Sequence, residues 1–149
     1  MSPIKVLIDL GLLCWSTIQL GLGKGWVSRQ DGIDYAVDLL VKGNDDESVA
    51  IIAGGELLGD DELLDLISNQ VEQSDKTGGL DKWRLAHLTS IAESNEDEQC
   101  KLDRLQEVYA NFDYPEDMAA CSIYSQDEID PLVAMMQVVE ELRNKLTQR

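Results

Sequence analysis

The chain is short of the side chains from which most active sites and metal centres are built. It has one histidine, His87, and three widely spaced cysteines with no CxxC pair. An odd, dispersed set of cysteines argues against both a disulfide framework and a zinc site. No serine lies in a GxSxG segment, and the carboxylates are too numerous to single out a catalytic pair. We therefore expect no enzyme activity, no catalytic residue, no metal and no cofactor, and we interpret His87 as a surface or half-buried side chain.

Long apolar runs are missing as well. No run approaches the roughly 18 apolar residues of a membrane span. The opening segment MSPIKVLIDLGLLCW has one basic residue, Lys5, and Asp9 interrupts its apolar run. Leu13 stands before Cys14, where a lipoprotein cleavage site has a small residue. We do not expect an export signal, and the cysteine pattern favours a reducing cytoplasm.

Basic residues are scarce relative to acidic ones. The 149 residues include 29 acids and 12 bases, which gives a net charge of −17 and a pI near 4.1. Two stretches carry nearly all of this charge, residues 28–65 with −9 and residues 93–117 with −7. Such a field repels nucleic acid and anionic membranes, and it attracts basic proteins. Solubility alone is the alternative explanation for the acidity.

The segment WVSRQDGIDYAVDLLVKG, residues 26–43, predicts one amphipathic helix. Ser28 suits the N-cap, Asp31 suits the positive helix start, and Gly43 suits a left-handed stop. The apolar spacing predicts one buried face, formed by Ile33, Ala36, Val37, Leu40 and Val41. Asp31, Asp34 and Asp38 are spaced three and four apart, so we expect an acidic stripe on the exposed side.

The remaining periodicity is also helical, and no alternating segment stands out as a strand. We expect an all-α single compact domain over residues 1–149, with about seven to eight helices packed as irregular antiparallel hairpins. Further helices are predicted over 3–9, from Ser16, from a cap at Asn44, Asp45 or Asp46 up to Gly54, from Asp60, over 80–93, from Asn95, and from Ser125 or Asp130. Their predicted core positions include Leu64 and Met136. GLGKGW is interpreted as a turn, QSDKTGG as a loop, and PEDMAACSIY as either a helical turn or an irregular loop.

Two segments resemble a known family. WSTIQLGLGKGWVSRQDGIDYAVDLL and EVYANFDYPEDM are similar to recurring segments of a bacterial family known only as domain of unknown function 2247. Members of that family occur among immunity proteins of polymorphic-toxin and contact-dependent growth-inhibition systems. The resemblance implies a cytoplasmic antidote that binds the C-terminal toxin domain of an effector, and many such toxins are nucleases with basic clefts. The family offers no agreed active-site residues to transfer.

Charge and resemblance together predict a stoichiometric inhibitor of a basic, RNA-cleaving toxin domain. Concentrated acid beside tyrosines is typical of a surface that docks a basic protein. The predicted partner-binding residues are Asp31, Asp34, Tyr35, Asp38, Glu96, Asp97 and Glu98. One alternative is an acidic adaptor or nucleic-acid mimic that binds a host nucleic-acid-binding protein. Another is a hydrolase that uses an acidic site and a divalent metal. The oligomeric state stays open.

Overall fold

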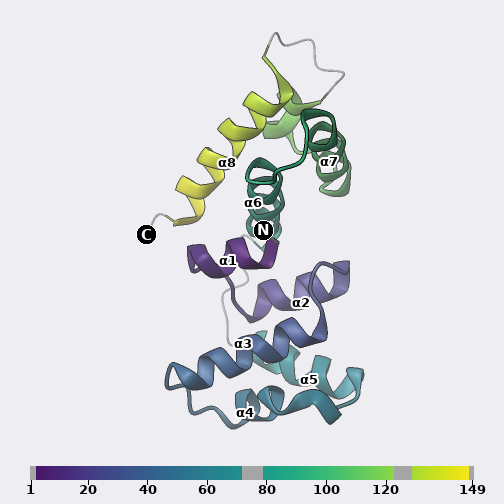
Figure 1. Cartoon of the computed structure of the whole chain (residues 1–149). Coiled ribbons are helices and arrows are strands. Elements are labelled where there is room, and N and C mark those ends of the chain that lie inside the picture. The colour runs from purple at the N-terminus through teal and green to yellow at the C-terminus, as the bar shows by residue number, and fades with distance from the viewer. Residues whose placement is uncertain (1–2, 72–78, 123–128, 148–149) are drawn as a thin grey trace. The chain divides into compact units, whose positions relative to one another are not determined.

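The computed structural model describes residues 3–71, 79–122 and 129–147, and every element in these ranges is helical (Figure 1). This confirms the all-α prediction. The elements are α1 (Pro3–Leu10), α2 (Trp15–Lys24), α3 (Arg29–Val41), α4 (Glu47–Ala53), the 3₁₀ segment η1 (Gly55–Leu57), α5 (Asp60–Val71), α6 (Gly79–Ala92), α7 (Glu98–Asn111), the 3₁₀ segment η2 (Glu116–Cys121) and α8 (Pro131–Thr147). The chain forms two compact units, residues 13–79 and residues 1–12 with 80–149. That the whole chain is one domain stays a prediction.

Helix α2 corrects two expectations in the unit formed by residues 13–79. It begins one residue before Ser16, and its N-cap is Cys14, whose N–H donates to the Thr17 hydroxyl at 3.0 Å. It also continues through most of the GLGKGW segment, which was expected to be a turn. Glycine is tolerated inside a helix at a modest cost, and here the left-handed turn is made by Gly25 at φ +77°.

Helix α3 begins as predicted. Ser28 and Asp31 form a reciprocal capping box, in which the Ser28 N–H donates to the Asp31 carboxylate at 2.9 Å. The predicted core face was partly wrong, because Val37 and Val41 are exposed at 44% and 81%. Each residue turns the chain by about 100°, so positions four apart drift by about 40°. The buried face is centred on Ile33 and Ala36, and that drift carries both valines out of it.

Arg29, the first residue of α3, connects this helix to η1 and to the start of α5. Its guanidinium donates to the Gly55 carbonyl at 2.8 Å and to the Leu58 carbonyl at 2.7 Å, and it pairs with Asp60 at the start of α5. Helix α3 packs on α4, α4 on α5, and α5 on α2. Leu64, predicted to point inward, is 42% exposed, because α5 buries the neighbouring row that contains Leu63 and Ile67.

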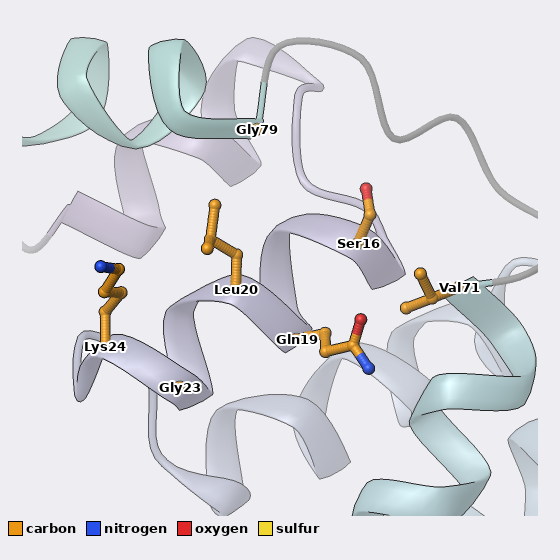
Figure 2. Close-up of a pocket in the computed structure, with 7 residues that line it drawn as sticks. All are labelled: Ser16, Gln19, Leu20, Gly23, Lys24, Val71 and Gly79. Atoms are coloured by element: carbon orange, nitrogen blue, oxygen red, sulfur yellow. The ribbon is translucent and has the colours of Figure 1, made fainter.

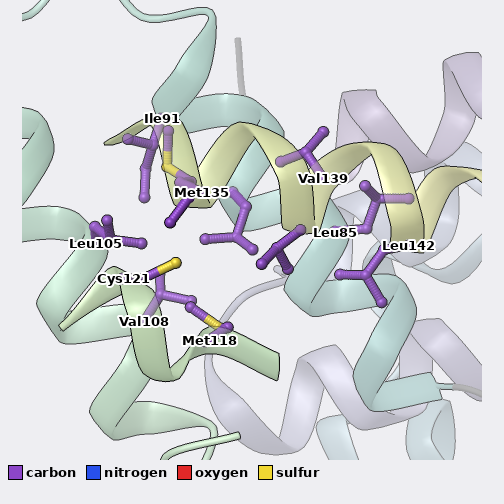
Figure 3. Close-up of a cluster of buried hydrophobic side chains, with 12 residues drawn as sticks. Leu85, Ile91, Leu105, Val108, Met118, Cys121, Met135, Val139 and Leu142 are labelled. Atoms are coloured by element: carbon purple, nitrogen blue, oxygen red, sulfur yellow. The ribbon is translucent and has the colours of Figure 1, made fainter. Parts of the chain in front are cut away.

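The second unit has a core of buried side chains from α6, α7, η2 and α8, which point toward one another in Figure 3. Two half-buried leucines at the end of the first chain segment, Leu10 and Leu12, pack against this cluster. Met136 was expected in the core but is half exposed, whereas Met135 is buried. The 17-residue α8 is long enough to have a full outer face, and position 136 falls on it.

Two helices in this unit begin next to a carboxylate that accepts a hydrogen bond from a backbone N–H of the first turn. Helix α7 was expected to be capped by Asn95, but Asp97 is its N-cap and accepts from the Cys100 N–H at 2.8 Å. A carboxylate suits the positive helix end better than an amide does. Helix α8 opens at Pro131, with Asp130 accepting from the Leu132 N–H at 2.8 Å. This agrees with the Asp130 alternative, while Ser125 lies outside the described residues.

Two consecutive left-handed residues close α7. The helix ends at Asn111, before Pro115, which had been expected to end it. Asp113 and Tyr114 follow at φ +60° and +55°. A left-handed conformation costs an L-residue about 1–2 kcal/mol. The chain then forms η2, so the PEDMAACSIY segment begins as a 3₁₀ helix.

A buried guanidinium connects η2 to α6. Arg84 is 6% exposed and pairs with Asp117 of η2 and, at 3.1 Å, with Asp81 one helical turn earlier. Asp81 also accepts from Lys145 of α8 at 3.1 Å. Burial opposes ionisation of Asp81, but the Lys145 and Arg84 contacts outweigh it and lower the pKa of this carboxyl. Three elements distant in sequence are thereby joined by one charge network.

Replacing Arg84 by lysine tests this network. An ammonium is a compact point charge that cannot reach two carboxylates with the geometry of a planar guanidinium. We expect Arg84→Lys to lower the free energy of unfolding by about 1–3 kcal/mol. Arg104→Lys is the matched control, because Arg104 pairs with Glu96 at a more exposed position, where about 0–1 kcal/mol is at stake. Urea denaturation measures the unfolding free energy of both variants. Equal losses would contradict the stabilising role of the Arg84 charge network.

Candidate functional site

The surface of α3 that faces solvent combines carboxylates with apolar side chains. Asp34, Val37, Asp38 and Val41 follow one another at intervals of three, one and three residues, and all four are exposed. On a helix this spacing makes them neighbours. We call this set the α3 face. Asp34 accepts from the Gln30 amide at 2.8 Å, and Asp38 pairs with Lys42 at 2.8 Å, with both side chains of that pair well exposed.

The other predicted residues on α3 have local structural roles. The Asp31 carboxylate closes the capping box with Ser28 and is half-buried. The Tyr35 ring packs edge-on against Trp15, with ring centres 4.8 Å apart, and its hydroxyl points to the Leu13 carbonyl at 3.5 Å. Burial, followed by the nearby Cys14 and Asp38, raises the pKa of Tyr35. Asp31 and Tyr35 therefore hold α3 in place, and Asp34 and Asp38 are its more available carboxylates.

The three predicted acids at the start of α7 differ in the same way. Glu96 pairs with Arg104, and Asp97 caps the helix. The hydrogen bond from the Cys100 N–H lowers the pKa of Asp97. Glu98 is exposed in the first turn. The sequence contains signals for these roles, because acids at N-cap and first-turn positions satisfy unpaired helix amides.

Sequence reasoning missed Val37 and Val41 as candidate contact residues. Their hydrophobic character and helical spacing assigned them to the core. A narrower apolar stripe, centred on Ile33 and Ala36, would have left them outside. The α3 face is consequently richer in apolar area than an acidic stripe, and protein interfaces combine both kinds of surface.

One hollow in the unit of residues 13–79 has a volume of about 510 Å³ and is lined mainly by one face of α2 (Figure 2). The lining residues are Ser16, Gln19, Leu20, Gly23, Lys24, Val71 and Gly79. None of these seven is a carboxylate or a histidine, so the described lining offers no general acid–base pair. Val71 and Gly79 flank residues 72–78, which lie outside the described part of the chain.

His87 lies next to two aromatic side chains, and its half-buried position agrees with the prediction. It is half-buried on α6, and its ring centre lies 6.1 Å from that of Trp83 and 6.0 Å from that of Phe112. Burial, helped by the charge of Arg104, lowers the pKa of His87 from 6.5 to about 4. The imidazole is therefore neutral at physiological pH.

A pH titration of stability tests this placement. In the unfolded chain His87 takes up a proton near pH 6.5, whereas in the fold it does so near pH 4. The stability it contributes is thus present above about pH 6.5 and is lost as the pH falls toward 4. Between pH 7 and pH 5 we expect the parent to lose about 1 kcal/mol relative to His87→Gln, after allowance for partial solvent access. If urea denaturation shows the same loss of unfolding free energy between pH 7 and pH 5 for both proteins, the buried placement of His87 is wrong.

Within the described ranges, no helix is both long and apolar enough to cross a membrane, and no group of three or more His, Cys, Asp or Glu side chains could hold a metal ion.

No curated protein matches the chain. No solved structure matches it. One family model does match, over residues 5–149, and its description is "Uncharacterized protein conserved in bacteria". Since the match covers nearly the whole chain, the protein belongs to this bacterial family, DUF2247.

Proposed function

We propose that the protein is a cytoplasmic immunity protein that binds and neutralises the basic, RNA-cleaving C-terminal domain of a cognate toxin. The observation that carries the proposal is the α3 face, where exposed carboxylates alternate with exposed valines on one rigid helix. The unit that contains it has thirteen acids and four bases, a net charge of −9. The resemblance of the two segments described above also supports this role.

Such an inhibitor needs no chemistry of its own, because it acts by covering the toxin's working surface. A nuclease cleft already presents lysines and arginines arranged for phosphates. Carboxylates held on a helix meet those groups without the ordering cost that a flexible tail incurs. Val37 and Val41 add apolar area, which contributes about 25 cal/mol per Å² removed from water. The valines and carboxylates thus provide affinity and orientation in the same patch.

The first test requires that the gene directly upstream encode a large exported protein, and it uses the C-terminal domain of that protein. We expect a one-to-one complex with it and protection of cells that express it. The double variant Asp34→Ala/Asp38→Ala should bind about 30- to 4000-fold more weakly if either carboxylate meets a desolvated arginine. Its melting temperature should stay close to that of the parent, since both side chains face solvent.

The matched control is Asp61→Ala/Asp65→Ala, which removes the same charge from exposed positions of α5. This variant should weaken binding only slightly, through the long-range field. Equal protection by the parent and both double variants would exclude the α3 face as the interface. Failure of the upstream domain to bind at all would contradict the proposed function, and capture of a host nucleic-acid-binding protein would favour the adaptor alternative.

Association kinetics give a second test of the same proposal. Charge-steered association slows as salt screens the field, and the screening length is about 8 Å at physiological ionic strength. We expect the on-rate for the toxin domain to fall steeply between low and high salt while the off-rate changes little. The Asp34→Ala/Asp38→Ala variant should show a shallower slope. An on-rate that does not respond to salt would mean that the acidity serves solubility only.

A further inference from the structure

We propose that Tyr114, flanked by Asp113 and Glu116, is a binding site for an arginine side chain of a basic protein partner. Tyr114 is 64% exposed, although it follows a helix whose neighbouring aromatic side chains, Tyr109 and Phe112, are half-buried. Its ring meets that of Tyr109 edge to face, with ring centres 5.1 Å apart, and Tyr109 packs against the core. The Tyr114 ring therefore contacts Tyr109 and is otherwise largely open to solvent.

The hydrogen bonds that close the turn involve no side chain. It is closed by backbone hydrogen bonds, from the Asp113 N–H to the Ala110 carbonyl at 3.1 Å and from the Tyr114 N–H to the Tyr109 carbonyl at 2.9 Å. Glycine is the usual residue at such a helix end, because it adopts a left-handed conformation without strain. Tyrosine at φ +55° is unfavourable there. Strain that persists at an exposed aromatic residue points to a role outside folding.

The acidic side chains and the exposed Tyr114 ring together favour arginine as the ligand. Residues 105–122 contain four acids and no lysine or arginine, so a cation meets no competing base in this stretch of the sequence. Asp117 is engaged by Arg84, whereas Asp113 and Glu116 are exposed. A guanidinium stacks on an aromatic face and also binds carboxylates through two parallel hydrogen bonds. An ammonium is more strongly hydrated and lacks the planar surface, so arginine fits this site better than lysine.

The inference deepens the proposed function, because it names how a basic partner is recognised, but its test does not depend on the toxin. The probes are labelled oligoarginine and oligolysine peptides of equal length, measured by fluorescence anisotropy at physiological ionic strength. For the parent we expect a preference for oligoarginine that falls about two- to fivefold in Tyr114→Ala, the loss expected for an exposed cation–π contact. Tyr114→Phe should retain the preference, since it keeps the ring.

Two controls separate this site from bulk charge and from loss of folding. Asp34→Ala/Asp38→Ala should weaken both peptides without changing their ratio. Tyr114→Gly should lose the preference and yet melt at or above the temperature of Tyr114→Ala, because glycine relieves the left-handed strain. A peptide ratio that is unchanged in Tyr114→Ala overturns the inference, even where the toxin domain still binds. A ratio that shifts as expected supports the arginine site, even if the toxin domain fails to bind.

Discussion

The structure of residues 80–149 depends on a guanidinium that is almost completely withdrawn from water. Arg84 is 6% exposed, and a buried charge is tolerated only where carboxylates and hydrogen bonds replace its hydration. Asp117 and Asp81 provide that replacement, and Lys145 balances the second carboxylate. The pairing draws η2 and the last turns of α8 to the start of α6. Apolar packing drives these elements together, while the charge network fixes which residues meet.

That network has a consequence for the surface. Once Asp117 is held against Arg84, the chain between the end of α7 and η2 must turn within a few residues. It does so through the left-handed Asp113 and Tyr114, which places a tyrosine in solvent. The EVYANFDYPEDM segment therefore carries two physical roles. Its last acid secures the fold, and its exposed tyrosine is the surface to which the arginine-binding proposal assigns a ligand.

Acidity in this protein has more than one cause, and the difference lies in what each carboxylate contacts. Asp31, Asp46 and Asp97 satisfy amides at helix starts, a local function that any helix of this kind needs. Asp60 and Asp117 pair with arginines that join separate elements. Asp34 instead projects from the middle of α3 and Asp38 from its last turn, where acids bring no benefit to the macrodipole. Residues without a structural role of this kind are the natural candidates for recognition.

The sequence alone determined the fold class, the positions of most helices and the cap at Ser28, because these depend on contacts within a few residues, and it offered Asp130 as one of two starts for the last helix. It also identified the acidic segments, since charge follows directly from composition. Only the tertiary structure decided which acids remain available and which apolar side chains stay outside. Val37, Val41, Leu64 and Met136 have the spacing of core residues, but burial depends on the direction from which a neighbouring helix approaches. Arg84 was likewise unremarkable in sequence, because a partner 33 residues away determines its role.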